Sequence, residues 1–266
     1  MTTTAPRPTD PRPADARPTD PRPTDRRAVL AAATAYVAAW LAGLAVLPEA
    51  VNAHAGAGSI GRYLVAHAGP AVLQSWLVHG VAGVALVWFV RSALAVLGQD
   101  EARPPALHRL TRWAALGAGA ASLLQVVILH AAVLSARSGS DGRAARWVHA
   151  VNGTDVVKLV LLGAVVAGTT LALGRADARG PADALGRTDG RGRPDGRGRA
   201  GARGWFTWPA AALALMLPVA GLAFVSTAPW LGGMLALSLV LLLTWAVAAA
   251  VLVTRRRRPA ASGLPR

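Results

Sequence analysis

"AVLQSWLVHGVAGVALVWFV", residues 71–90, is a run of twenty residues without a charged side chain. Because an α-helix rises 1.5 Å per residue, such a run spans about 30 Å, which is the thickness of the hydrocarbon core of a bilayer. Only helices and closed barrels satisfy their backbone hydrogen bonds in lipid. The run therefore predicts a transmembrane helix.

Similar apolar runs recur along the 266-residue chain. The uncharged span from Gly204 to Thr254 is too long for one crossing, and "STAPW", residues 226–230, divides it because proline breaks helices. Charged residues make up only 15% of the chain, against about 25% in soluble proteins. The predicted fold class is all-α, a polytopic bundle of six transmembrane helices over residues 28–254. The expected helices are about 28–48, 70–90, 113–136, 155–174, 205–226 and 229–254.

The segments outside these helices are polar or of low complexity. Residues 1–27 repeat an Arg/Pro/Thr/Asp unit, and residues 175–203 form a loop rich in Arg and Gly. Neither segment has enough apolar residues to form a core, so both are predicted to be disordered. Residues 255–266 form a basic tail.

The arginines predict the orientation in the membrane. With a cytoplasmic N-terminus, 23 arginines fall on the cytoplasmic side and four on the outside. The positive-inside rule therefore places both termini in the cytoplasm of a protein of the cell membrane. The alternative, that "RRAVL" (26–30) begins an export signal, is less favoured because its apolar run is as long as a crossing.

The same distribution indicates the partners. The lipid bilayer is expected to contact the helices, and anionic lipids are expected at the cytoplasmic arginine clusters. No nucleic-acid partner is predicted, because Asp residues dilute the charge of the loop 175–203 and aromatic residues are missing from its arginine-rich repeats.

Polar side chains gather in the predicted outer halves of the second, third and fourth helices. Polar groups in a membrane are costly, so each is a candidate functional residue. We expect a polar pocket open to the outside, which would serve a small-molecule or lipid binding, accessory or transport-like protein. The candidate ligand-binding residues are Gln74, Ser75, His79, Gln125, His130, Asp155 and Lys158.

A simpler interpretation exists for Asp155 and Lys158. If the fourth helix begins near Asp155, the carboxylate lies in its first turn and Lys158 can extend to water at the outer face. Sequence reasoning favours this helix-end anchor over a buried functional ion pair. No acidic residue is then expected near the midplane of the bilayer, which argues against a proton-coupled transporter.

Other functions remain as alternatives. His79 and His130 lie on neighbouring predicted helices at similar depth, which would suit the axial ligands of haem b, so a haem or quinone redox protein is one alternative. A structural subunit of a membrane complex, with a membrane protein partner, is another. No cofactor or metal is predicted and no catalytic residue is assigned. The chain has no cysteine, and it has neither the H-E-x-x-H motif of metalloproteases nor a P-loop.

Three segments resemble a family of uncharacterised six-helix bacterial integral membrane proteins, of the domain-of-unknown-function type. They are "AVLQSWLVHGVAGVALVWFV" (71–90), "LLQVVILHAAV" (123–133) and "VHAVNGTDVVKLVLLGAVVAG" (148–168), and the most recognisable element is the pattern Asn152, Asp155, Lys158 and Leu159. The resemblance implies fold and location but no activity.

Overall fold

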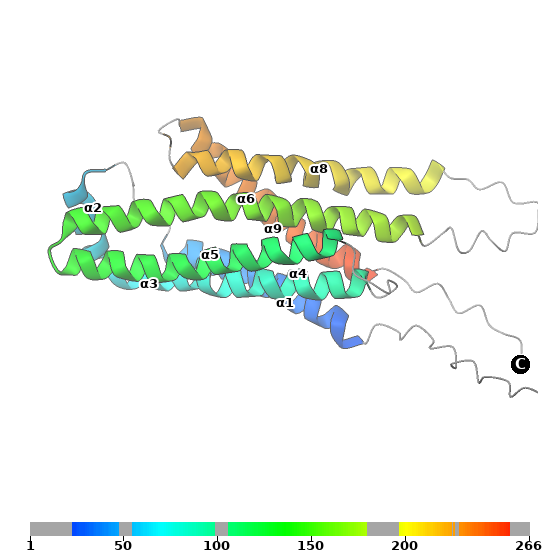
Figure 1. Cartoon of the computed structure of the whole chain (residues 1–266), viewed down its shortest axis with the longest axis horizontal. Coiled ribbons are helices and arrows are strands. Elements are labelled where there is room, and N and C mark those ends of the chain that lie inside the picture. Colours follow the sequence, from blue (N-terminus) through cyan, green and yellow to red (C-terminus); the bar gives the residue numbers. More distant parts are fainter. Residues whose placement is uncertain are drawn as a thin grey trace, which may run out of the picture.

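The computed structural model is an elongated bundle of helices, most of which run along its length (Figure 1). It describes residues 23–47, 55–98, 106–179, 197–224, 226 and 229–255. Within these residues, six helices are long and apolar enough to cross a membrane. The predicted fold class is confirmed, and the protein is a multi-pass membrane protein.

The six crossings differ in how they are built. Five are formed by single helices, although α8 ends in a 3₁₀ turn (η2). The second crossing combines two α-helices with one π-helical turn (η1) between them. The elements are α1 (Pro23–Val46), α2 (Ala57–Ala66), α3 (Ala68–Ser75), η1 (Trp76–Val81), α4 (Ala82–Leu97), α5 (Ala106–Arg137), α6 (Asp141–Arg179), α8 (Arg197–Gly221), η2 (Leu222–Phe224) and α9 (Pro229–Arg255).

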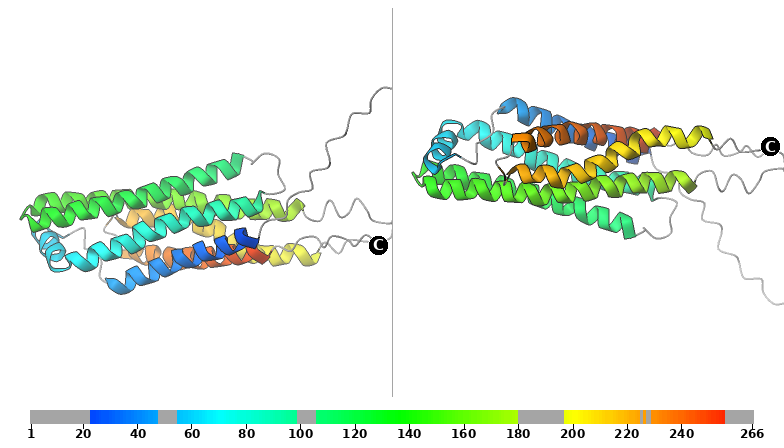
Figure 2. Two further views of the ribbon diagram at one scale, coloured as in Figure 1. Left: turned by 90° about the horizontal axis from the view of Figure 1, so that it is seen from below. Right: turned by 90° about the horizontal axis from the view of Figure 1, so that it is seen from above.

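The crossings form a closed ring in sequence order. Each of α1, α4, α5, α6 and α8 packs against the next crossing, and α9 returns to pack against α1. Figure 2 shows the same elongated bundle from two further sides. The connection from α5 (to Arg137) to α6 (from Asp141) is short, which gives antiparallel packing of these two neighbours.

The interior of the ring is filled by side chains. Phe89 of α4 and Trp245 of α9 meet edge to face, with ring centroids 6.0 Å apart. The indole of Trp245 also donates a hydrogen bond of 3.3 Å to the hydroxyl of Thr170 on α6. These contacts across the ring make it a packed bundle rather than a pore.

Two glycines let α6 approach its neighbours closely. A Cβ atom on Gly163 would lie 2.7 Å from the carbonyl oxygen of Ala214 on α8. A Cβ atom on Gly168 would collide with the side chain of Thr111 on α5. Small residues at such crossings are typical of membrane helices, whose association depends on van der Waals packing.

The α5–α6 hairpin turns in a Schellman motif. Ser140 N donates to Ser135 O and Gly139 N donates to Ala136 O, both within 3.0 Å. Gly139 has a φ of 73°, a left-handed conformation that glycine adopts without steric cost. We call this end of the bundle the hairpin end, and the opposite end, where the described chain begins and finishes, the arginine-rich end.

A second, smaller core lies at the hairpin end. The short helix α2 places Ile60 and Leu64 against Ala132 and Val133 of α5 and Val148 of α6. At this end the α5–α6 hairpin and α2 extend beyond the ends of α1 and α8 (Figure 1). The helix α2 is not among the helices predicted from the sequence.

Several helices extend beyond the predicted boundaries. The third helix begins at Ala106 instead of residue 113, and the fourth runs over Asp141–Arg179 instead of 155–174. Both ends of the loop 175–203, which was predicted to be disordered, are helical, as are residues 23–27 of the predicted tail. The rest of that loop, most of the N-terminal repeat and residues 256–266 lie outside the described residues.

Candidate functional site: a polar centre between three crossings

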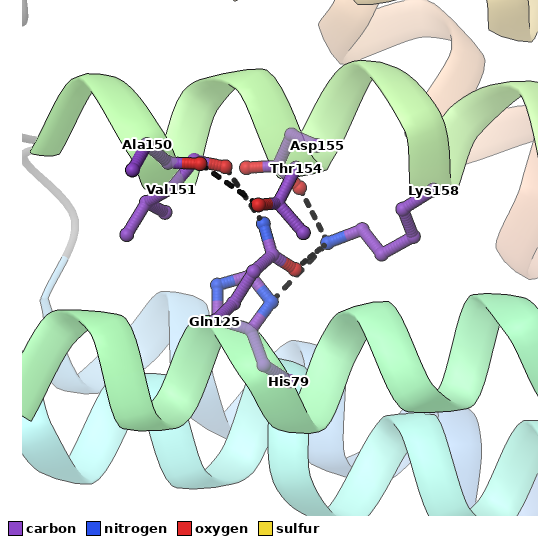
Figure 3. A network of polar contacts seen from close by, with 7 residues as sticks. All are labelled: His79, Gln125, Ala150, Val151, Thr154, Asp155 and Lys158. Atoms are coloured by element: carbon purple, nitrogen blue, oxygen red, sulfur yellow. Dashed lines mark hydrogen bonds and ion pairs between the residues drawn. The ribbon is translucent and has the colours of Figure 1, made fainter. Parts of the chain in front are cut away.

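Lys158 of α6 lies at the middle of a network of polar side chains (Figure 3). Its ammonium group forms an ion pair with Asp155 one turn earlier on the same helix. It donates a hydrogen bond of 2.8 Å to Gln125 Oε1 of α5 and contacts His79 Nδ1 of η1 at 3.2 Å. We call these four residues the polar centre.

The three contacts match the donor capacity of Lys158. An ammonium group has three N–H donors and no acceptor, and the polar centre supplies three acceptors. With Lys158 charged, we infer that His79 Nδ1 is the unprotonated nitrogen of the ring, which leaves the ring proton on Nε2.

Gln125 uses both ends of its amide. While Oε1 accepts from Lys158, Nε2 donates to the carbonyl oxygen of Val151 on α6 at 3.2 Å. The amide thus bridges a side chain and a backbone group of the same neighbouring helix. Thr154 takes no part in the polar centre, because its hydroxyl donates to Ala150 O on its own helix.

Burial of Lys158 overturns the helix-end interpretation. Gln125 is 0% exposed, Lys158 is 5% exposed and Asp155 is 8% exposed. Lys158 follows the first residue of α6, Asp141, by seventeen residues. The prediction that Asp155 lies in the first turn, with Lys158 reaching water, is wrong because packing against α2 and α5 extends the helix by almost four turns.

The polar centre lies in the half of the bundle nearer the hairpin end. Gln74 Nε2 donates to Leu47 O, at the end of α1, with a distance of 2.8 Å. His79 follows Gln74 by five residues, which places it about 7 Å deeper along the helix. That this half of the bundle is the outer one stays a prediction.

His79 lies in the π-helical turn η1. Such single π turns inside α-helices are rare and occur frequently at functional sites. The side chain of His79 is only partly buried, unlike the other three members of the polar centre. Sequence analysis did not predict η1.

The remaining predicted site residues lie elsewhere. Gln74 binds the end of α1, and Ser75 is buried with no hydrogen-bond partner among the described residues. His130 Nδ1 donates to Val126 O of its own helix, and the ring of His130 meets Trp76 edge to face. The structure therefore brings together four of the seven predicted residues.

The haem alternative gains no support from these contacts. His79 contacts Lys158, whereas His130 lines a cavity of about 270 Å³ beside α3 that His79 does not line. Among the residues that the structure describes, no group of three or more His, Cys, Asp or Glu could hold a metal ion. Three of the four members of the polar centre are buried, and the open pocket expected from the sequence stays a prediction.

Comparison with known proteins does not identify the chain. No known family, curated protein or solved structure matches it. The resemblance to uncharacterised six-helix membrane proteins stays a prediction. The function has to be inferred from the polar centre and its surroundings.

Proposed function

We propose that the protein is a membrane-embedded binding or transport-like component whose polar centre responds to protons at His79. The observation that carries this proposal is the contact of Lys158 Nζ with His79 Nδ1. It joins a charged donor on α6 to the one titratable acceptor that η1 contributes. Within the described residues, Lys158 and Asp155 are the charged groups that act on His79.

A proton on His79 Nδ1 is incompatible with this contact. Protonated histidine donates from both ring nitrogens, so it cannot accept from an ammonium group. It would also place two positive charges about 3 Å apart in a medium where charges are poorly screened. Protonation of His79 is therefore expected to release η1 from α6, while Asp155 and Gln125 keep Lys158 in place.

The π turn gives this release a structural consequence. A π turn holds one residue more than an α turn, so its conversion to α-helix rotates one side of the helix by about 100° relative to the other. The segment α3–η1 contacts α1 and α5 and continues into α4. A local change at His79 could thereby reach several crossings. Since the polar centre lies in the half nearer the hairpin end, it is proposed as a switch facing that end and not as a proton path through the membrane.

Hydrogen–deuterium exchange of the full-length protein in lipid nanodiscs tests the proposal. Acidification from pH 7.5 to pH 3, after correction for intrinsic exchange rates, should increase exchange in residues 68–81. The increase should be lost in His79→Asn. It should persist in His130→Asn, the matched control, because His130 is also partly buried but bonds to its own helix.

Two outcomes would contradict the proposal. One is exchange in residues 68–81 that does not change with pH in the natural protein. The other is a pH response that survives in His79→Asn. Either result would leave the polar centre as a fixed link between helices, as expected for a structural subunit of a membrane complex.

A further inference from the structure

A groove of about 770 Å³ lies between α4 and α5 in the arginine-rich half of the bundle. None of the four residues of the polar centre lines it. Both walls come from membrane-crossing helices, and Asp25 of α1 also lines the groove. A ligand in the groove would therefore be in contact with lipid along part of its length.

The end of the groove near Asp25 is positively charged. Arg91 of α4 and Arg112 of α5 both line it, and their two positive charges exceed the single negative charge of Asp25. Asp25 also interacts with another group. The Nε atom of Arg112 is buried and has no hydrogen-bond partner among the described residues. A buried donor without an acceptor is unfavourable, so this position favours an anionic ligand that brings acceptor oxygens.

The remainder of the groove is apolar. Val84, Leu116 and Leu123 line it and are 57%, 41% and 44% exposed, respectively. Its floor is the crossing of α4 and α5, where a Cβ atom on Gly119 would lie 2.6 Å from Val87 Cγ2. From Arg112 to Leu123 the groove extends about 16 Å along α5, at the rise of an α-helix.

Trp88 marks the boundary between the two parts. It lines the groove one turn before Arg91 and is 47% exposed. Tryptophan is enriched at the level of lipid headgroups, where one side of the ring meets hydrocarbon and the other meets water. The order along the groove is thus guanidinium groups, an interfacial tryptophan and an apolar channel, which is also the order of phosphate, glycerol and acyl chain in a lipid.

We propose that this groove binds one anionic phospholipid from the leaflet at the arginine-rich end. The phosphate accepts hydrogen bonds from Arg112 and Arg91, and an acyl chain lies along Val84, Leu116 and Leu123. Arginine suits this role because its fork of donors matches phosphate oxygens. The proposal of a lipid site does not rest on the proton response proposed at His79.

Native mass spectrometry of the full-length protein in a nonionic detergent tests the site. Phosphatidylglycerol and phosphatidylcholine with the same acyl chains are added in turn, and inorganic phosphate is added as a competitor. The protein should retain one phosphatidylglycerol more tightly than phosphatidylcholine. Each arginine removed in Arg91→Gln and Arg112→Gln should weaken retention by about fivefold.

The matched control is Arg109→Gln. Arg109 lies on the same helix, one turn before Arg112, and is exposed outside the groove, so its removal should leave retention unchanged. Equal loss in Arg109→Gln, or equal retention of the two lipids by the natural protein, would overturn the proposal. Displacement by inorganic phosphate would overturn it too, since it would show that the acyl channel contributes nothing.

A second variant tests the acyl channel without touching the arginines. Ala120 lines the groove and is exposed, so Ala120→Trp should fill the channel while the bundle stays folded. Retention of phosphatidylglycerol should fall by at least the amount caused by one arginine. Unchanged retention in a folded Ala120→Trp protein would contradict an acyl chain in the groove.

Discussion

Lys158 is the single lysine of the sequence, and its burial has to be offset by its partners. Removal of a charge from water costs several kcal/mol, which attraction alone rarely repays. Here Asp155 supplies the opposite charge, while Gln125 and His79 supply the two further acceptors. The polar centre is therefore stable as a unit and sensitive to the loss of any one member.

The first prediction concerns the ion pair. Lys158→Met leaves Asp155 as an unpaired buried carboxylate, so the free energy of unfolding should fall by about 3 kcal/mol or more. Asp155→Leu combined with Lys158→Met removes both charges and should recover most of the loss. Both variants are compared with the natural protein by chemical unfolding in detergent micelles.

Thr154→Val is the control for that series. It removes a hydroxyl that bonds only to its own helix, so its effect should stay below about 1 kcal/mol. If the double variant proves no more stable than Lys158→Met alone, the two charges do not depend on each other and the ion pair is not the stabilising contact.

Sequence reasoning identified the members of the polar centre but not their arrangement. His79, Gln125, Asp155 and Lys158 stand out because polar residues are rare in apolar runs. Gln74 and His130 are equally unusual in an apolar run, but their side chains donate hydrogen bonds to backbone carbonyls and do not join the polar centre. Hydropathy does not fix the rotation of each helix, and rotation decides which side chains meet.

At the scale of elements, α6 shows why the helix-end interpretation was wrong. Residues 141–154, "DGRAARWVHAVNGT", contain three charged residues, so the sequence predicts a loop before the apolar run. In the structure Ala144, Ala145 and Val148 pack against α2 and α5, so tertiary contacts extend the helix. The apolar runs predicted all six crossings, because membrane insertion depends on hydropathy. Their ends depend on contacts that hydropathy does not describe.

The second prediction tests the close approach of α6 and α8. Gly163→Ala places a methyl group 2.7 Å from a backbone oxygen of α8, so the bundle should lose about 1–3 kcal/mol of stability. Gly174→Ala on the same helix meets nothing within 4 Å, and it should stabilise α6 by up to about 1 kcal/mol. The midpoints of thermal unfolding of the two variants should therefore move in opposite directions. A shared direction would contradict the packing of Gly163 against Ala214.

For the whole molecule, the ring of six crossings places the two sets of loops on opposite sides. Among the described residues most arginines lie at one end, and the positive-inside rule predicts that this end is cytoplasmic. The number of crossings could be predicted from the sequence. Closure of the ring and the filling of its interior by Phe89 and Trp245 could not, because neighbour order depends on packing.

The third prediction tests the orientation. The natural chain has no cysteine, so a single introduced thiol reports its own location. Gly142→Cys at the hairpin end, where nothing lies within 4 Å, should react with a membrane-impermeant maleimide in intact cells. Arg109→Cys at the arginine-rich end should react only after lysis. The reverse pattern would invert the topology and place the polar centre in the inner half of the membrane.

The most direct measurement of the polar centre is ¹⁵N solid-state NMR of the histidine side chains in lipid bilayers, with His79→Asn used to assign the signal of His79. At neutral pH we predict a neutral ring with the proton on Nε2 and with Nδ1 accepting from Lys158. Acidification should protonate Nδ1 and remove this signal, and Lys158→Met should shift it at neutral pH. A proton on Nδ1 at neutral pH would contradict the account, because Lys158 could not then donate to His79 and the proton response would have no structural basis.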